Sequence, residues 1–113
     1  MIRVTVYKTG RHGYTGIDLS GHAGYEDAGH DIVCAAVSVL VINTVNSIER
    51  FTEDKTSCIS DEDTGNIQFR FMNPPTHDAL LLFESMVSGL EAIEENREYE
   101  PYIDIIFKEV SVP

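Results

Sequence analysis

Two short stretches at the start of the chain alternate between apolar and polar residues. In IRVTVYK, the apolar residues Ile2, Val4 and Val6 fall on one face of an extended chain. In YTGIDLSG, Ile17 and Leu19 do the same. A period of two residues is typical of a strand with one buried face. Because the turn sequence TGRHG separates the two stretches, the pattern predicts an N-terminal β-hairpin.

The pattern changes between about Ile32 and Arg50. Apolar residues fall on every side in the first half of this segment and thin out to Val45 and Ile48 in the second half. The many β-branched residues favour a strand, but about 18 residues without Gly or Pro favour a helix, because strands of that length are rare. We therefore predict a helix that begins after Asp31, with Asp31 as its N-cap. A helix that is apolar all round is expected to be buried in the core.

The second half of the chain repeats a hairpin, a helix and a strand. The stretches KTSCIS and NIQFRFM flank the acidic turn DEDTGN and predict a second hairpin. Thr76 or Asp78 is expected to cap a helix over about residues 77–97, whose acidic residues face water. Its apolar positions recur at steps of three and four residues: Ala79, Leu82, Phe83, Met86, Leu90 and Ile93. The sequence EYEP ends this helix, and YIDIIFKEV predicts a final strand.

The predicted order of elements is ββαββαβ. Strands and helices in this proportion favour an α+β fold, a two-layer sandwich in which a mixed or antiparallel sheet of about five strands carries two helices on one face. A chain of 113 residues without an internal repeat or linker fits a single domain over residues 1–113.

The charge of the chain narrows the classes of partner. With 19 acidic and 8 basic residues, the formal charge is −11, which disfavours nucleic-acid binding and favours a basic partner. The start has no signal-peptide pattern, and the longest apolar run, residues 32–42, is too short to span a membrane. We therefore expect a cytoplasmic protein that does not act at a membrane. Cys34 and Cys58 are too few for a disulfide framework and are expected to stay reduced.

The stretch GHAGYEDAGHDIVC suggests a reactive thiol at Cys34. In the predicted helix, Cys34 lies in the first turn, where unpaired backbone N–H groups and the helix dipole favour a thiolate. The same amides can donate to an oxyanion. His22 lies twelve residues earlier, and a loop containing Gly24 and Gly29 can bring its imidazole to the sulfur. A thiolate–imidazolium pair would then act as a nucleophile and base.

Three further residues bear on this chemistry. Asp31 would oppose the thiolate unless it faces the imidazolium or serves as the cap. Ser38 lies one helical turn after Cys34 on the same face, and it can donate a hydrogen bond to the sulfur or to Asp31. His30 is closer to Cys34 in sequence than His22 is, but near the cap it need not point toward the sulfur.

Other interpretations of these residues remain open. Cys34 can be an inert core residue, the glycines can mark only turns, and Ser38 can bond back to a helix carbonyl. His22, His30 and Cys34 could instead bind zinc, although the spacing matches no compact zinc signature and a fourth ligand is missing unless Asp31 or water supplies it. The acidic surface also suits a binding module without catalysis. We expect a packing role for Cys58.

The stretch GHAGYEDAGHDIVCAAVS strongly resembles the signature of the ribosomal-processing cysteine protease family, Prp. The predicted order of elements fits that family along nearly the whole chain. The resemblance implies a bacterial cytoplasmic endopeptidase that removes a short N-terminal extension from a large-subunit ribosomal protein of the L27 family during ribosome maturation. It also implies a homodimer, and neither a metal nor another cofactor.

The resemblance also assigns roles to residues. It places the family's histidine at His22, as base and proton donor, and its cysteine at Cys34, as the nucleophile that forms a thioacyl-enzyme. Supporting roles fall on Asp31 and Ser38. The glycine-rich segment is expected to rearrange around the substrate. From the residues alone, and not from the resemblance, we expect Tyr25, as a hydrophobic side chain near this loop, to line a substrate pocket. The residues of this predicted substrate loop are Gly21, Gly24, Tyr25 and Gly29.

Overall fold

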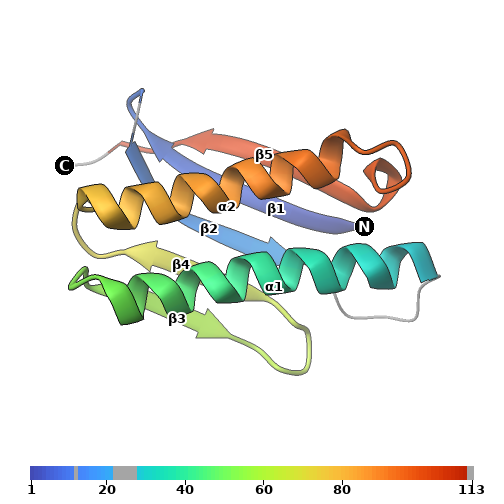
Figure 1. Cartoon of the computed structure of the whole chain (residues 1–113), viewed down its shortest axis with the longest axis horizontal. Helices are drawn as coiled ribbons and strands as arrows, with labels where there is room; N and C mark the ends of the chain where they lie inside the picture. Colours follow the sequence, from blue (N-terminus) through green and yellow to red (C-terminus); the bar gives the residue numbers. More distant parts are fainter. Residues whose placement is uncertain (12, 22–27, 112–113) are drawn as a thin grey trace.

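The structure is a computed structural model that describes residues 1–11, 13–21 and 28–111. One five-stranded sheet, in the order β3-β4-β2-β1-β5, carries both helices on one face (Figure 1). The prediction of a two-layer α+β fold with the order ββαββαβ is confirmed. The elements are β1 (Ile2–Thr9), β2 (Gly13–Ser20), α1 (Ala28–Phe51), β3 (Thr56–Ser60), β4 (Ile67–Phe71), α2 (His77–Glu95), the 3-10 helix η1 (Glu100–Tyr102) and β5 (Ile103–Glu109).

The alternating residues of the two hairpins form the helix-facing side of the sheet. In the antiparallel pair β1–β2, Val4 lies opposite Leu19 and Val6 opposite Ile17, and all four side chains are buried. The β1–β5 pair is parallel, so the sheet is mixed. Parallel neighbours need a crossover connection, and β5 reaches β1 after the chain has passed through α2 on the covered face (Figure 1).

Helix α1 buries one side and exposes the other. Val33, Val37 and Val41 are fully buried against the core. On the opposite side Val39 is 66% exposed and Ile42 is 47% exposed. The prediction that this helix is buried all round is therefore wrong, because a two-layer sandwich covers a helix on its sheet side only.

The same helix passes a simple test for a membrane span. By length and composition alone, His30–Phe51 is long and apolar enough to cross a membrane. The apolar run over residues 32–42, on which the sequence-based prediction relied, is too short to do so. One such helix is weak evidence, because the core helix of a soluble protein passes the same test. Here the buried valines of α1 pack into the core of the sandwich.

Helix α2 begins at the predicted residue but is capped differently from the prediction. Thr76 occupies the N-cap position, yet its side chain makes no capping bond within the helix. Instead, the Thr76 hydroxyl donates to one carboxylate oxygen of Asp54, and the Thr76 backbone N–H donates to the other at 2.9 Å. Asp78 lies inside the first turn of α2. The start of α2 is therefore fixed by the segment that follows α1, not by α2's own cap residue alone.

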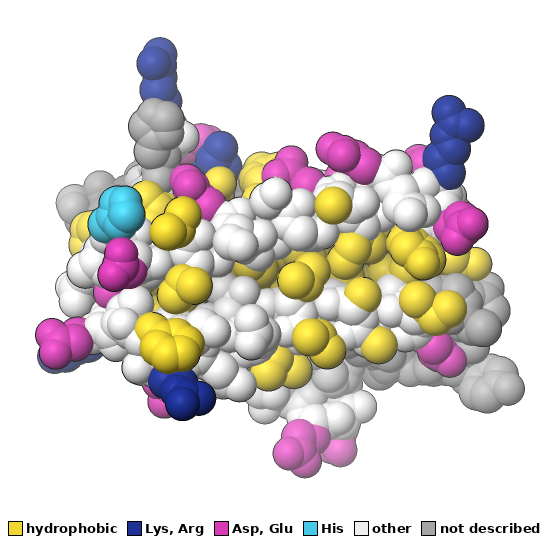
Figure 2. Space-filling model, viewed as in Figure 1, with side chains coloured by type: hydrophobic (Ala, Val, Ile, Leu, Met, Phe, Trp, Pro, Cys, Tyr) yellow, Lys and Arg dark blue, Asp and Glu magenta, His cyan; other side chains and the backbone are white. Residues whose placement is uncertain are grey.

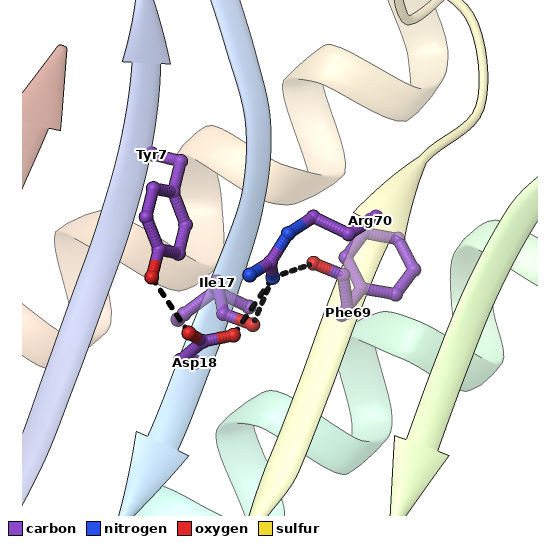
Figure 3. A network of polar contacts seen from close by, with 5 residues as sticks. All are labelled: Tyr7, Ile17, Asp18, Phe69 and Arg70. Carbon is purple, nitrogen blue, oxygen red and sulfur yellow. Dashed lines mark hydrogen bonds and ion pairs between the residues drawn. The ribbon is translucent and has the colours of Figure 1, made fainter. Parts of the chain in front are cut away.

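A polar network joins three strands on the face of the sheet without helices (Figure 3). The Tyr7 hydroxyl donates to Asp18 Oδ2 at 2.7 Å, and Arg70 Nη1 donates to Asp18 Oδ1 at 2.7 Å. The same nitrogen of Arg70 donates to the carbonyls of Ile17 and Phe69. Burial alone would raise the pKa of Asp18, but the bonds from Arg70 and Tyr7 outweigh it and hold that pKa below its usual value.

Candidate active site

Cys34 lies in the second turn of α1, not in the first. The helix begins at Ala28, so Cys34 is its seventh residue and Asp31 lies inside the first turn. The prediction that Asp31 caps the helix is wrong, because Ala28 and Gly29 extend the helix upstream. The backbone N–H of Cys34 belongs to the helical ladder, and the dipole effect weakens beyond the first turn.

The Cys34 side chain is half-buried at the border of the core. It packs against the buried cluster that includes Val33 and Val37, but it is not sealed inside that cluster. A partly exposed cysteine side chain can contact a peptide, whereas a fully buried structural thiol is inert. The position of Cys34 therefore fits a nucleophile.

Ser38 and His30 lie one helical turn on either side of Cys34. Residues four apart share a helix face, so α1 brings His30, Cys34 and Ser38 into one row, as predicted for Ser38. Ser38 is half-buried, and the His30 side chain is only 2% exposed. His30 Nδ1 lies 4.0 Å from a carboxylate oxygen of Asp31, whose own side chain is 72% exposed.

His30 is the residue near Cys34 whose burial the sequence did not predict. Its steps of four residues to Cys34 and seven to Val37 place it on the buried side of a helix, but only if the helix already includes residue 30. Because the predicted helix began after Asp31, His30 lay outside it, and its spacing to Cys34 did not indicate a shared helix face.

The segment before α1 contains the other predicted residues. Gly21 follows β2 with a φ of 91°, a left-handed conformation that favours glycine. A Cβ at this position would collide with the carbonyl oxygen of Met1. Gly29 belongs to α1, not to a loop as predicted. His22, Gly24 and Tyr25 lie outside the described residues, so their predicted roles stay predictions.

Metal binding is only partly tested. Within residues 1–11, 13–21 and 28–111, no group of three His, Cys, Asp or Glu side chains is placed to hold a metal ion. The zinc alternative includes His22, which lies outside those ranges, and it stays untested.

The second cysteine differs from Cys34 in its setting. Both cysteines are described, and they are not joined in a disulfide. Cys58 is exposed in β3, so the prediction of a packing role is wrong. Desolvation and, to a lesser degree, the Glu49 carboxylate raise the pKa of the Cys58 thiol. Cys58 is therefore less reactive at neutral pH than an ordinary exposed thiol.

Comparison with known proteins finds similarity to cysteine proteases. The family model described as cysteine protease Prp matches residues 1–104. The ribosomal processing cysteine protease Prp of Staphylococcus aureus is 31% identical over 107 residues, covering 95% of this chain and 97% of that protein.

Two crystal structures of the S. aureus protease resemble this fold. The complex with a substrate peptide has a TM-score of 0.88 and 30% sequence identity, covering 96% of this chain and 100% of that one. The complex with a covalently linked product peptide has a TM-score of 0.84, with the same identity and coverage.

Proposed function

Because the chain belongs to the cysteine protease Prp family, we propose that it removes the N-terminal extension of a large-subunit ribosomal protein of the L27 family, with Cys34 as the nucleophile and His22 as the base. The observation that carries this proposal is the half-buried sulfur of Cys34 on α1, in a chain that matches the family over residues 1–104. The relatives' substrate-peptide and product-peptide complexes support a peptide as the substrate.

The residues divide the reaction into two steps. His22 takes the proton of the Cys34 thiol, and the thiolate attacks the scissile carbonyl. The C–N bond breaks, the imidazolium protonates the leaving amine, and a thioester remains on Cys34. Water, with its proton taken by His22, then hydrolyses the thioester to a carboxylic acid and restores the thiol.

The position of Cys34 in α1 limits what the helix itself can contribute to the reaction. Cys34 has left the first turn, so its own amide is not an oxyanion donor, and the helix dipole adds little to thiolate stability. Activation of the sulfur therefore depends on the imidazole. Ser38, one turn after Cys34, is placed for a supporting hydrogen bond to the sulfur. Asp31, exposed beside His30, would favour the imidazolium if it faces His22.

The test is cleavage of the purified unprocessed precursor, followed by mass spectrometry. We expect one shortened product with the unchanged chain, and a loss of rate of about 10³-fold or more in Cys34→Ala and in His22→Ala, since members of such a dyad act as a unit. Cys58→Ala is the matched control and should cleave normally. Undiminished cleavage by Cys34→Ala would refute the proposal. Binding of the precursor without any cleavage would favour the non-catalytic binding module.

Three further parts of the proposal concern the setting of the protein. The formal charge of −11 suits a basic protein substrate and disfavours direct nucleic-acid binding. The family resemblance supports a homodimer, which sedimentation equilibrium would test by the mass in solution. It also supports a cytoplasmic location without a membrane role, which cell fractionation would test.

A further inference from the structure

The two flanks of α1 face different parts of the molecule. Leu40 faces α2, because a Cβ built on Gly89 would lie 3.2 Å from a methyl carbon of Leu40. At about 100° per residue, Cys34, Ser38 and Val45 fall on the flank away from α2. Cys34 and Ser38 therefore lie on the same flank of α1 as Val45, which lines a cavity together with residues of β3.

A cavity of about 230 Å³ lies farther along this flank. Cys34 is eight to twelve residues from the helix positions that line it, which corresponds to about 12–18 Å along the axis. An extended peptide covers that distance in about four or five residues. The cavity is lined by Ile42, Val45 and Asn46 of α1, Cys58 and Ser60 of β3, and Ile67 of β4.

Strand β3 is an edge of the sheet and borders the same cavity. Its one sheet neighbour is β4, so on its other side every second residue directs backbone N–H and C=O groups outward. The strand TSCIS carries no charged residue, whereas exposed edges are commonly protected by charge. An extended peptide can pair with such an edge while a side chain enters a neighbouring pocket.

The charges around the cavity are acidic. The exposed residues Asp61, Glu62 and Asp63 follow Ser60 directly in the β3–β4 turn, and Glu49 lies one turn beyond Val45 on α1. Helix α1 has no Lys or Arg before Arg50. Figure 2 shows hydrophobic side chains along α1, with acidic side chains projecting from the edge below them. A second copy of this chain, at −11, is repelled by such a rim, whereas a basic peptide is attracted.

We propose that the groove between α1 and β3 binds the extended part of the substrate, with an apolar side chain four or five residues from the scissile bond in the cavity beside Ile42 and basic residues at its acidic rim. The inference rests on the proposed peptide cleavage and adds a determinant of specificity to it. The groove then recognises substrate residues that lie four or five positions from the scissile bond.

The experiment compares Ile42→Arg with Val39→Arg in cleavage of two peptides. Val39 is the matched control, because it is an exposed aliphatic residue on α1 that points outside the cavity lining. The long peptide spans eight residues on each side of the scissile bond, and the short one spans three. We expect Ile42→Arg to lower kcat/KM for the long peptide at least tenfold, chiefly through KM, and to leave the short peptide unchanged. Val39→Arg should change neither.

Equal effects of Ile42→Arg on the long and short peptides, or no effect on either, would overturn the inference while leaving the protease function intact. If Ile42→Arg changes the oligomeric mass in solution while cleavage stays normal, the groove is a subunit interface. That result also overturns the inference. If the unchanged chain cleaves nothing, binding of the fluorescent long peptide to Cys34→Ala, with and without Ile42→Arg, still tests the groove. In that case, weaker binding only in the Ile42→Arg protein supports it, and equal binding refutes it.

Discussion

At the scale of single residues, the chemistry depends on how Cys34 becomes ionised. Its place in the second turn of α1 removes most of the help that a helix start gives to a thiolate. Its half-buried side chain packs against the apolar core. In the proposed mechanism, the imidazole of His22 supplies most of the activation.

Alkylation measures this activation directly. We expect iodoacetamide to modify Cys34 at pH 6 in the unchanged chain, because an ion pair with His22 keeps a thiolate present below the pH at which an ordinary thiol reacts. Cys58 should react slowly at the same pH, because its raised pKa lowers its thiolate fraction. Peptide mapping by mass spectrometry gives the rate at each cysteine.

The control for alkylation is His22→Ala. In that variant the reaction of Cys34 at pH 6 should slow at least tenfold, while that of Cys58 stays the same. Identical pH profiles for Cys34 in both proteins would show that His22 does not activate the sulfur.

Helical geometry explains which site residues the sequence could reveal. The four-residue step between Cys34 and Ser38 places them on one face of any helix that contains both, so their relation was predictable. The helix start was not, because Asp31 is a stronger capping signal than the Ala28–Gly29 pair that the helix includes. The burial of His30 was missed for the same reason.

At the scale of elements, Asp54 couples the end of α1 to the start of α2. Both carboxylate oxygens accept bonds from Thr76, across 22 positions of sequence. The sequence placed Thr76 at the start of α2 correctly but could not reveal its partner, since contacts between distant residues leave no local pattern.

Substitution tests this contact. Asp54→Ala should lower the free energy of unfolding by about 1 kcal/mol, the order of magnitude for hydrogen bonds to a partly exposed carboxylate. The exposed neighbouring residue supplies the control, and Glu53→Ala should have little effect. Urea denaturation followed by circular dichroism measures both, and equal stability of the two variants would contradict the assigned role of Asp54.

At the scale of the whole molecule, one helical layer covers one face of the sheet, and the other face is held by polar contacts. Alternation in β1, β2 and β4 predicted the covered face well, because apolar residues at a period of two mark it directly. The open face was not predicted, since Tyr7, Asp18 and Arg70 come from three strands whose order the sequence does not state. The wrong expectation that α1 is enclosed came from its apolar residues on every side, which do not show that the sheet covers only one side of the helix.

The open-face network predicts how stability depends on pH. The pKa of Asp18 is lower in the folded chain than its unfolded value of about 3.9. Its carboxylate therefore stabilises the fold above about pH 4, and this contribution is lost as the pH falls through the lower folded pKa. Asp18→Asn should reduce stability at pH 7, by about 1 kcal/mol for partly exposed charged contacts.

Urea titrations at pH 7 and pH 3 check this prediction. The difference in unfolding free energy between the unchanged chain and Asp18→Asn should shrink at the lower pH. A difference that stays constant or grows on acidification would contradict the role given to the Asp18 carboxylate.

Nucleophilic catalysis by Cys34 is tested most directly by the intact mass of the protein, measured after its reaction with the precursor peptide is stopped rapidly with acid. We predict a transient species heavier by the N-terminal fragment less one water, attached through a thioester to Cys34 and absent in Cys34→Ala. Cleavage that proceeds without any such adduct, or an adduct that persists in Cys34→Ala, would contradict nucleophilic catalysis by this sulfur.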